Sequence, residues 1–217
     1  MIKTKELFEH YKIGLKIEFC KNDSLVSRAR NNLIAKAMSN KSITHLMFID
    51  NDITWDPMNV IKLLISEKAI IGGIYPLKKY NWNKLINNKE FIKNTIEKKN
   101  NSHMKNFIDD ETFIQYNLLK YNVNYKNTEI VIDKNITEVR HVATGFMMIK
   151  REAIENMSVA YSSTKYSDDV DFLTEEENKY AYALFDCGVE DNHYLSEDWM
   201  FCSLSLIHIS EPTRHER

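Results

Sequence analysis

The sequence predicts an α/β fold with a mainly parallel sheet flanked by helices, and three observations support this prediction. Residues 46–49 are apolar without polar alternation, which is typical of a strand buried on both faces of such a sheet. This run ends at Asp50 and Asp52, and strands of parallel sheets carry ligands at their carboxyl ends. Strand, helix and strand patterns at residues 46–49, 58–66 and 69–75 then predict a βαβ unit with a right-handed crossover.

The other elements follow from periodicity along the chain. Residues 25–38 carry apolar side chains at helical spacing, which predicts a helix. Gly72 and Gly73 lie inside a predicted strand and mark a place where a ligand or another backbone comes close to it. Residues 78–134 are rich in Lys and Asn and predict an insertion of short helices and loops. Further helices are expected at residues 4–11, 151–157 and 196–202, strands at 15–20, 136–150 and 181–186, and a polar acidic loop at 161–179.

Composition narrows the class of protein. A chain of 217 residues with 43% hydrophobic residues can bury one substantial core, so we expect a single domain over residues 1–203. The net charge of -2 gives no general attraction to nucleic acid or anionic membranes. No apolar run approaches the roughly 20 residues of a membrane span, and no signal peptide is recognisable, so we expect a cytoplasmic protein. The three cysteines indicate neither a disulfide framework nor a zinc site.

The last residues of the chain do not look like part of the natural protein. Residues 204–214 read LSLIHISEPTR and resemble the translation of a sequencing adapter. We therefore expect residues 204–217 to be a non-native tail, and we exclude them from functional reasoning. The natural protein would then continue differently after residue 203.

The two carboxylates after the apolar run indicate a metal site. Mg²⁺ and Mn²⁺ prefer oxygen ligands and are often held by one or two carboxylates together with substrate phosphates. Asp50, Asn51 and Asp52 therefore predict an anchor for a metal-bound diphosphate. The alternative is a solvated turn that caps the helix beginning near Pro57.

Five short motifs follow one another along the chain: SRARN (27–31), FIDND (48–52), GGIYP (72–76), ATGFM (143–147) and SED (196–198). Their order resembles that of GT-A fold glycosyltransferases, and the similarity is greatest to the small domains of phages and large DNA viruses, including viral rhamnosyltransferase-like domains. The resemblance implies a GT-A-like, Rossmann-like sheet that lacks its first strand and its C-terminal segment here. It also implies Mn²⁺- or Mg²⁺-dependent transfer of a sugar from a UDP-, GDP- or dTDP-sugar to a hydroxyl of a glycan or another acceptor.

The resemblance assigns the donor site residue by residue. Asp52 is the expected metal ligand, Asp50 reaches the ribose or the metal's water shell, and Asn51 is a spacer that could bond the nucleotide. An arginine fork suits phosphate, but Arg28 and Arg30 point about 200° apart on a helix. We therefore favour Arg30 for the donor, and a surface salt bridge is the alternative for Arg28.

The resemblance also supplies a candidate base. Asp198 matches the catalytic carboxylate that would deprotonate the acceptor if the reaction inverts, with Glu197 as the neighbouring candidate. The alternative is that both acids only stabilise a helix N-terminus. Further donor-site candidates are Asn31, Gly73, Thr144 and Gly145, and the acceptor or sugar candidates are Asp186, Tyr75, Trp82 and Tyr80.

Two other functions compete for the same residues. In a haloacid-dehalogenase-type phosphatase, Asp50 would be the nucleophile and Asp52 the acid and base. Such an enzyme also needs an acidic metal-binding pair, for which Asp168 and Asp169 are the available residues. A nucleotide- or sugar-binding fragment without turnover is the third possibility.

Overall fold

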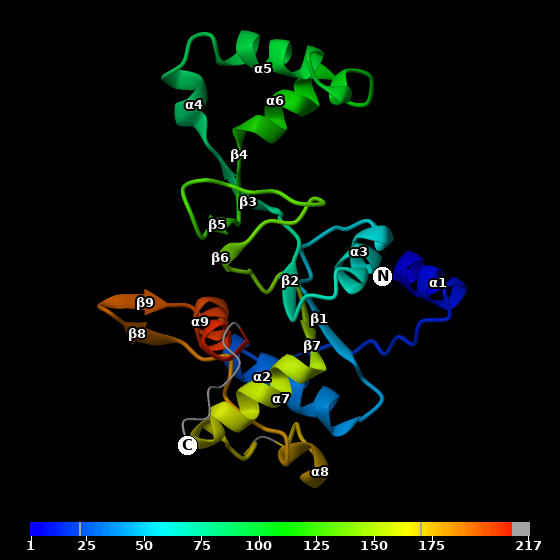
Figure 1. Cartoon of the computed structure of the whole chain (residues 1–217). Coiled ribbons are helices and arrows are strands. Elements are labelled where there is room, and N and C mark those ends of the chain that lie inside the picture. Colours follow the sequence, from blue (N-terminus) through cyan, green and yellow to red (C-terminus); the bar gives the residue numbers. More distant parts are fainter. Residues whose placement is uncertain (22, 170, 210–217) are drawn as a thin grey trace. The chain divides into compact units, whose positions relative to one another are not determined.

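The computed structural model describes residues 1–21, 23–169 and 171–209, which form a mixed α/β structure with small antiparallel sheets (Figure 1). The chain divides into two compact units. We call Met1–Gly73 together with Val123–Arg217 the main unit, and Ile74–Asn122 the inserted unit. The expected insertion at residues 78–134 overlaps the inserted unit, which begins and ends earlier.

The central sheet of the main unit is antiparallel. It consists of β1 (His45–Ile49), β7 (Phe146–Lys150) and β2 (Ile70–Gly72) in the order β1-β7-β2. Both outer strands run antiparallel to β7, so they share one direction, and α3 (Pro57–Ile65) connects them. The mixed α/β class is confirmed, but the described strands contain no parallel neighbours, so the expected mainly parallel pairing is not found.

The apolar run at residues 46–49 forms β1, an outer strand in which only Leu46 is buried, so the expected burial on both faces is not found either. The buried strand of this sheet is β7, in which four of the five residues are buried and the sequence is apolar without alternation. An apolar sequence without alternation indicates that both faces of a strand are buried, and this holds for the middle strand of this antiparallel sheet as well. The direction of the neighbouring strands is set by chain connectivity, which the pattern does not encode.

The core of the main unit lies between this sheet and three helices, α2 (Val26–Ser39), α7 (Arg151–Ala160) and α9 (Glu197–Ile209). Helix α7 packs against α9, and Phe185 and Phe201 stack with ring centroids 4.0 Å apart. The largest buried side chains are Phe185, Phe201, Ile34, Met147, Ile149, Ile154, Met157 and Leu184.

Several expected elements of the main unit differ in the structure. Residues 15–20 form no strand and no helix, and residues 181–186 make one isolated bridge, between Lys165 and Tyr182, in place of a strand. Residues 136–150 contain two strands with a loop between them. The remaining elements are α1 (Ile2–His10), β5 (Asn124–Tyr125), β6 (Val139–His141), η2 (Ser162–Thr164), α8 (Glu175–Asn178), β8 (Gly188–Glu190) and β9 (His193–Leu195).

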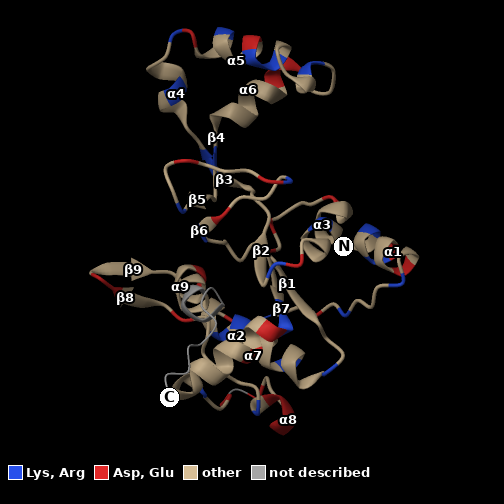
Figure 2. Ribbon diagram, in the orientation of Figure 1, with Lys and Arg blue, Asp and Glu red and all other residues tan. Residues whose placement is uncertain are grey.

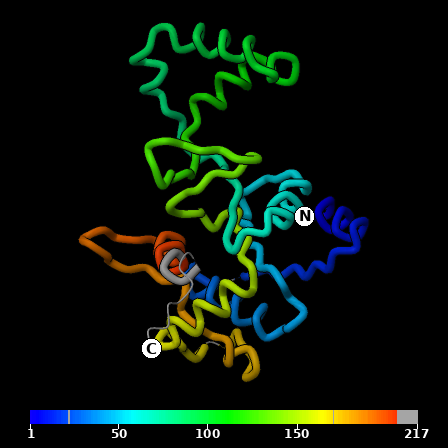
Figure 3. The backbone as a smooth tube through the Cα atoms, in the orientation of Figure 1, coloured from blue at the N-terminus to red at the C-terminus, as the bar shows by residue number. Residues whose placement is uncertain are grey.

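The inserted unit consists of short helices and one two-stranded ribbon, traced in green at the top of Figure 3. Its strand β3 pairs antiparallel with β4, and its buried residues are Thr95, Lys99 and Leu118. Lys99 forms an ion pair with Asp110. The elements are β3 (Pro76–Tyr80), α4 (Trp82–Ile86), α5 (Phe91–Asn100), η1 (His103–Asn106), α6 (Asp110–Leu118) and β4 (Leu119–Tyr121).

The two glycines at the end of β2 accommodate strand β7. A Cβ atom on Gly72 would lie 2.8 Å from the carbonyl oxygen of Phe146 and 2.3 Å from Cγ1 of Val142. A Cβ atom on Gly73 would lie 2.6 Å from the Phe146 ring. Of the two expected reasons for these glycines, the structure shows the close approach of another segment of the chain.

Helix α9 continues past residue 203, where the adapter-like sequence begins. Leu204 packs against the core, and its carbonyl oxygen accepts a hydrogen bond of 3.0 Å from the hydroxyl of Tyr161. Residues 210–217 of the expected tail lie outside the described residues. Within the part of the chain that the structure describes, no helix is long and apolar enough to span a membrane.

Candidate functional site

Arg30 joins three elements of the main unit that carry predicted site residues. Its Nη2 lies 3.6 Å from Oδ1 of Asp50, at the end of β1, and its Nε lies 3.5 Å from Oε1 of Glu197, at the start of α9. The guanidinium carbon also lies 5.6 Å from the ring centroid of Phe48 and 6.0 Å from that of Phe185. We call Arg30, Asp50 and Glu197 the Arg30 junction.

The guanidinium of Arg30 keeps unused hydrogen-bonding capacity. Its Nε and Nη1 atoms are the buried side-chain atoms without a hydrogen-bond partner among the described residues. Glu197 lies 3.5 Å from Nε without satisfying it as a hydrogen-bond acceptor, and the ion pair with Asp50 is made by a third nitrogen, Nη2. Leaving a buried donor unsatisfied costs about 1–3 kcal/mol, so an oxyanion that accepted these N–H groups would offset that cost.

Asn31, the next residue, has a structural role. Its Nδ2 donates to the carbonyl oxygen of Phe185, and its Oδ1 accepts from the backbone N–H of Phe185, both at 2.8 Å. This pair ties Phe185 to α2. Residues 181–186 are also joined to residues 164–166 by backbone hydrogen bonds, from the N–H of Tyr166 to Ala181 at 3.1 Å and from the N–H of Ala183 to Thr164 at 2.9 Å. Both polar atoms of Asn31 are thus engaged by the backbone, although the resemblance implied a donor contact.

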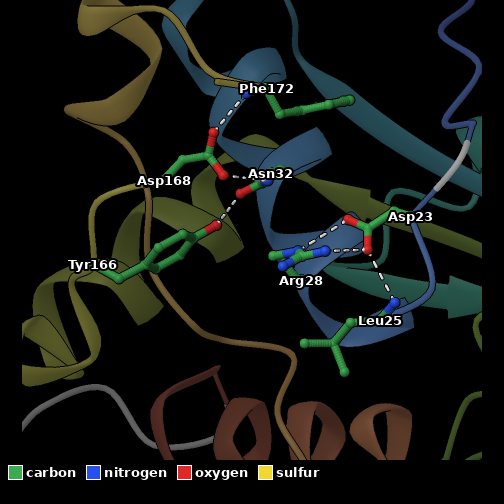
Figure 4. A network of polar contacts seen from close by, with 7 residues as sticks. All are labelled: Asp23, Leu25, Arg28, Asn32, Tyr166, Asp168 and Phe172. Atoms are coloured by element: carbon green, nitrogen blue, oxygen red, sulfur yellow. Dashed lines mark hydrogen bonds and ion pairs between the residues drawn. The ribbon is translucent and has the colours of Figure 1, made fainter. Parts of the chain in front are cut away.

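Arg28 points to a different part of the main unit (Figure 4). It forms an ion pair of 2.8 Å with Asp23, which also accepts from the backbone N–H of Leu25 at 2.9 Å. The hydrogen bond from Arg28 lowers the pKa of the Asp23 carboxyl. This is the surface salt bridge that was the alternative for Arg28, and Arg30 is the arginine that lies at Asp50.

A second set of contacts in Figure 4 holds the acidic loop against α2. Asn32 donates to Asp168 at 3.2 Å and accepts from the hydroxyl of Tyr166, and Asp168 accepts from the backbone N–H of Phe172 at 2.7 Å and of Leu173 at 3.1 Å. Burial, with the Asp168 charge, raises the pKa of Tyr166 to about 12. Asp168 therefore organises its own loop.

The predicted metal anchor lies in an exposed turn after β1. The N–H of Asp50 donates to the carbonyl oxygen of Gly145 at 3.0 Å, so the loop between β6 and β7 lies against this turn. Thr144 in that loop is buried, whereas Asn51 and Asp52 are exposed. The expected turn alternative included capping of the next helix, but the capping residue is Asp56, which accepts from the N–H of Met58 at 2.8 Å.

The donor set allows only an open metal site. No group of three or more His, Cys, Asp or Glu residues that could hold a metal ion occurs among the described residues. Asp50 and Asp52 supply oxygen ligands of the type that Mg²⁺ and Mn²⁺ prefer, and such ions often complete their coordination with water and substrate phosphates. The residues therefore suit a metal that arrives with a phosphorylated substrate, and do not suit a closed structural metal site.

The two acids at the start of α9 face different partners. Glu197 belongs to the Arg30 junction, whereas Oδ1 of Asp198 accepts from the hydroxyl of Ser196 and from the N–H of Trp199 at 2.9 Å. The ring of His141 stacks on Trp199 with a centroid distance of 4.2 Å and an interplanar angle of 4°. The sequence could not separate the roles of these neighbouring acids, and the geometry does.

His141, at the end of β6, is held by two contacts. Its Nδ1 lies 3.1 Å from Nδ2 of Asn124, in addition to the stack on Trp199. Burial lowers the pKa of His141, and the nearby Asp198 carboxylate partly opposes this. The imidazole is thus favoured in its neutral form.

Tyr194 is 72% exposed on β9, and sequence reasoning did not place it near the predicted site residues. A hydrogen bond with the Cys187 side chain raises its pKa, and the carboxylates of Glu197 and Asp186 act in the same direction. Hairpin β8–β9 therefore brings Tyr194 near two predicted site residues. The sequence signal was the turn at Asp191 and Asn192, which have positive φ angles of 48° and 64°, as a tight hairpin turn requires.

Asp186 and the aromatic candidates take different places. Asp186 is exposed, and its Oδ1 accepts from the N–H of Cys187 at 2.8 Å. Tyr75 and Trp82 belong to the inserted unit. The N–H of Tyr75 donates to Oδ1 of Asn122 at 2.8 Å, and the ring of Trp82 lies 5.4 Å from that of Tyr80.

Comparison with known proteins adds no relative to this description. No family model matches the chain, and the searches of curated proteins and of solved structures also found no match.

Proposed function

We propose that the protein is a metal-dependent glycosyltransferase that transfers a sugar from a nucleotide-sugar donor to a hydroxyl of a glycan or another acceptor. One observation carries the proposal. The unsatisfied buried donors of Arg30 lie next to Asp50, and Asp52 follows two residues later in the exposed turn. A cationic fork beside two carboxylates suits a diphosphate that carries a divalent ion.

Each residue would then have a distinct part in the reaction. Asp52 and Asp50 would hold Mn²⁺ or Mg²⁺, which stabilises negative charge on the leaving diphosphate. Arg30 would donate hydrogen bonds to a phosphate oxygen, and Glu197 would keep the guanidinium in place. Asp198 would take the proton of the acceptor hydroxyl, whose oxygen forms the new bond to the anomeric carbon. The bond from that carbon to the diphosphate breaks, and its electron pair leaves with the diphosphate.

Calorimetry with UDP, GDP and dTDP, with and without Mn²⁺, tests the donor site. We expect one of the nucleotides to bind in a Mn²⁺-dependent manner and the Asp52→Ala variant to lose this binding. Asp169→Ala is the matched control, because Asp169 is an exposed aspartate outside the Arg30 junction. Nucleotide binding that needs no metal and is unchanged in Asp52→Ala would contradict the proposal, because the nucleotide would then bind at a different site.

Turnover separates the proposal from its two rivals. A glycosyltransferase hydrolyses its nucleotide sugar slowly without an acceptor, a phosphatase cleaves phosphomonoesters, and a binding fragment does neither. Asp169→Ala would impair the phosphatase, which needs the pair Asp168 and Asp169, but not the transferase. The backbone contacts of Asp168 are a further reason to prefer the transferase, since they already engage this carboxylate.

Two conservative variants divide the roles at the start of α9. We expect Asp198→Asn to lower kcat by about 10²–10⁴-fold with little change in KM, because a general base acts in the transition state. Glu197→Gln should chiefly raise KM for the donor, because it loosens Arg30. The opposite pattern would make Glu197 the base.

A further inference from the structure

The inserted unit is basic, while the rest of the chain is acidic. Residues 74–122 contain nine lysines and five acids, a net charge of +4, and because the whole chain carries -2 the remainder carries -6. The stretch from residue 74 to residue 89 contains four lysines and no acid, and all four are exposed. Figure 2 draws Lys and Arg in blue and shows blue segments on β3 and α4. The lysines are Lys78, Lys79, Lys84 and Lys89.

Two aromatic rings lie among these lysines. Tyr80 is 39% exposed and Trp82 is 55% exposed, and their ring centroids are 5.4 Å apart at an angle of 43°. Every residue of β3 is exposed, so the strand presents both of its faces. We call Lys78, Lys79, Tyr80, Trp82 and Lys84 the basic aromatic strip.

Contacts within the inserted unit explain only part of the strip: Nζ of Lys84 donates to the carbonyl oxygen of Asn117 at 2.9 Å, whereas the ring of Trp82 is left 55% exposed. The buried residues of this unit lie elsewhere, on α5 and α6, where Lys99 is neutralised by Asp110. Exposed aromatic rings offer large apolar faces at little cost in side-chain entropy, which is why they recur at binding surfaces. Lysines beside them add point charges that select for anions.

We propose that the basic aromatic strip binds an anionic glycan, with the Tyr80 and Trp82 rings against sugar faces and the lysines at carboxylate or sulfate groups. This glycan would be the acceptor of the sugar, and in that respect the inference rests on the proposed function. A glycan matches the strip better than a nucleic acid does. Duplex DNA carries one charge per about 1.7 Å, and the acidic remainder of the chain repels a polyanion of that density more than a sparsely charged glycan.

Binding of three polymers to the whole protein tests this assignment. The probes are polygalacturonate, neutral dextran and a duplex DNA oligonucleotide, each measured by calorimetry at several salt concentrations. We expect polygalacturonate to bind more tightly than the other two, with an affinity that falls as salt rises. Trp82→Ala and Lys79→Glu should each weaken this binding by at least about fivefold.

The control variants lie on the same unit outside the strip. Phe107→Ala removes a ring that is 81% exposed, and Lys105→Glu reverses an exposed lysine, so both should leave polygalacturonate binding unchanged. Equal losses in strip and control variants would reduce the effect to general charge and overturn the proposal. Tighter binding of the oligonucleotide, or no binding of polygalacturonate, would overturn it as well.

The donor assay keeps this inference separate from the proposed function. Nucleotide binding should be the same in Trp82→Ala as in the parent protein, and a thermal melt confirms that the variant is folded. Metal-dependent nucleotide binding without polygalacturonate binding would remove only the strip proposal. Polygalacturonate binding without any nucleotide binding would remove the transferase and leave a glycan-binding surface.

Discussion

Strands β7 and β3 have five residues each and opposite surroundings. Four residues of β7 are buried between two neighbouring strands, whereas all five residues of β3 are exposed in a two-stranded ribbon. In the main unit, apolar packing fixes the strand that places Gly145 against Asp50. In the inserted unit, the strand carries lysines and aromatic rings into solvent. The main unit is thus built to position polar groups, and the inserted unit to present a surface.

The largest difference between the two strands should appear in stability. Ile149 on β7 is fully buried, so Ile149→Ala should lower the free energy of unfolding by about 2–5 kcal/mol, through lost burial and a cavity. Leu77 on β3 is 45% exposed, so Leu77→Ala should change it by less than about 0.5 kcal/mol. Chemical denaturation of both variants measures the two values. Similar losses of stability in the two variants would mean that β3 is buried in solution, and the contrast between β7 and β3 would then be wrong.

Within the main unit, neighbouring residues of α2 should separate structure from function. Asn31→Ala leaves two buried backbone groups of Phe185 without partners, so it should cost about 2–3 kcal/mol of stability. Arg30→Met should cost less than Asn31→Ala, because the loss of its ion pairs with Asp50 and Glu197 is partly offset by removal of a buried charge with unsatisfied donors. Denaturation curves of the two variants give both values.

The same pair has a functional readout. Arg30→Met should weaken nucleoside diphosphate binding by about tenfold or more, since charge-assisted hydrogen bonds contribute about 1.5–3 kcal/mol each. If Arg30→Met destabilises the protein as much as Asn31→Ala does, Arg30 is a structural residue and the candidate donor site loses its main support.

The sequence predicted the end of β1 and its acids but not the neighbours of that strand. The apolar run at residues 46–49 predicted a strand buried on both faces, but β1 is an outer strand, and the direction and number of its neighbours depend on residues far away in the sequence. The helical angle between Arg28 and Arg30 correctly predicted that the two side chains point to different partners, Asp23 for Arg28 and Asp50 with Glu197 for Arg30, whereas donor binding by Arg30 stays a prediction. Local rules succeeded where the answer depends on residues close in sequence.

The failures share the opposite property. Phe185 is tied to α2 by Asn31, which lies 154 positions away in the sequence, and no local pattern records such a contact. The raised pKa of Tyr194 likewise depends on the hairpin β8–β9, since Cys187 and Glu197, which cause it, lie on other segments of the chain. Residues 15–20 have the composition of a strand, but no described strand pairs with them.

A smaller effect is expected at the buried lysine of the inserted unit. The Lys99 side chain is 8% exposed and pairs with Asp110, whose side chain is 53% exposed. Asp110→Asn should therefore cost about 1 kcal/mol, less than the removal of a fully buried partner, because solvent screens the exposed carboxylate. Denaturation at low and high salt measures it, and Glu111→Gln on the same helix turn is the control. No loss at either salt concentration would show that Lys99 is held by its apolar stem alone.

The smallest expected effect is the pH dependence that His141 gives to the main unit. Its pKa in the folded protein lies below its ordinary value of 6.5, chiefly because burial disfavours the charged form. Between the two values the unfolded chain binds more protons, so stability is complete above about pH 6.5 and falls as the pH is lowered. His141→Asn should reduce this fall, measured as the free energy of unfolding between pH 7 and 5. Burial also lowers the pKa of His45, which acts on stability in the same direction. Some pH dependence of the stability should therefore remain in His141→Asn, and it should shrink further when His45 is replaced as well. Stability that rose on acidification in the parent protein, and not in His141→Asn, would instead mean that the Asp198 carboxylate governs the charge of this imidazole.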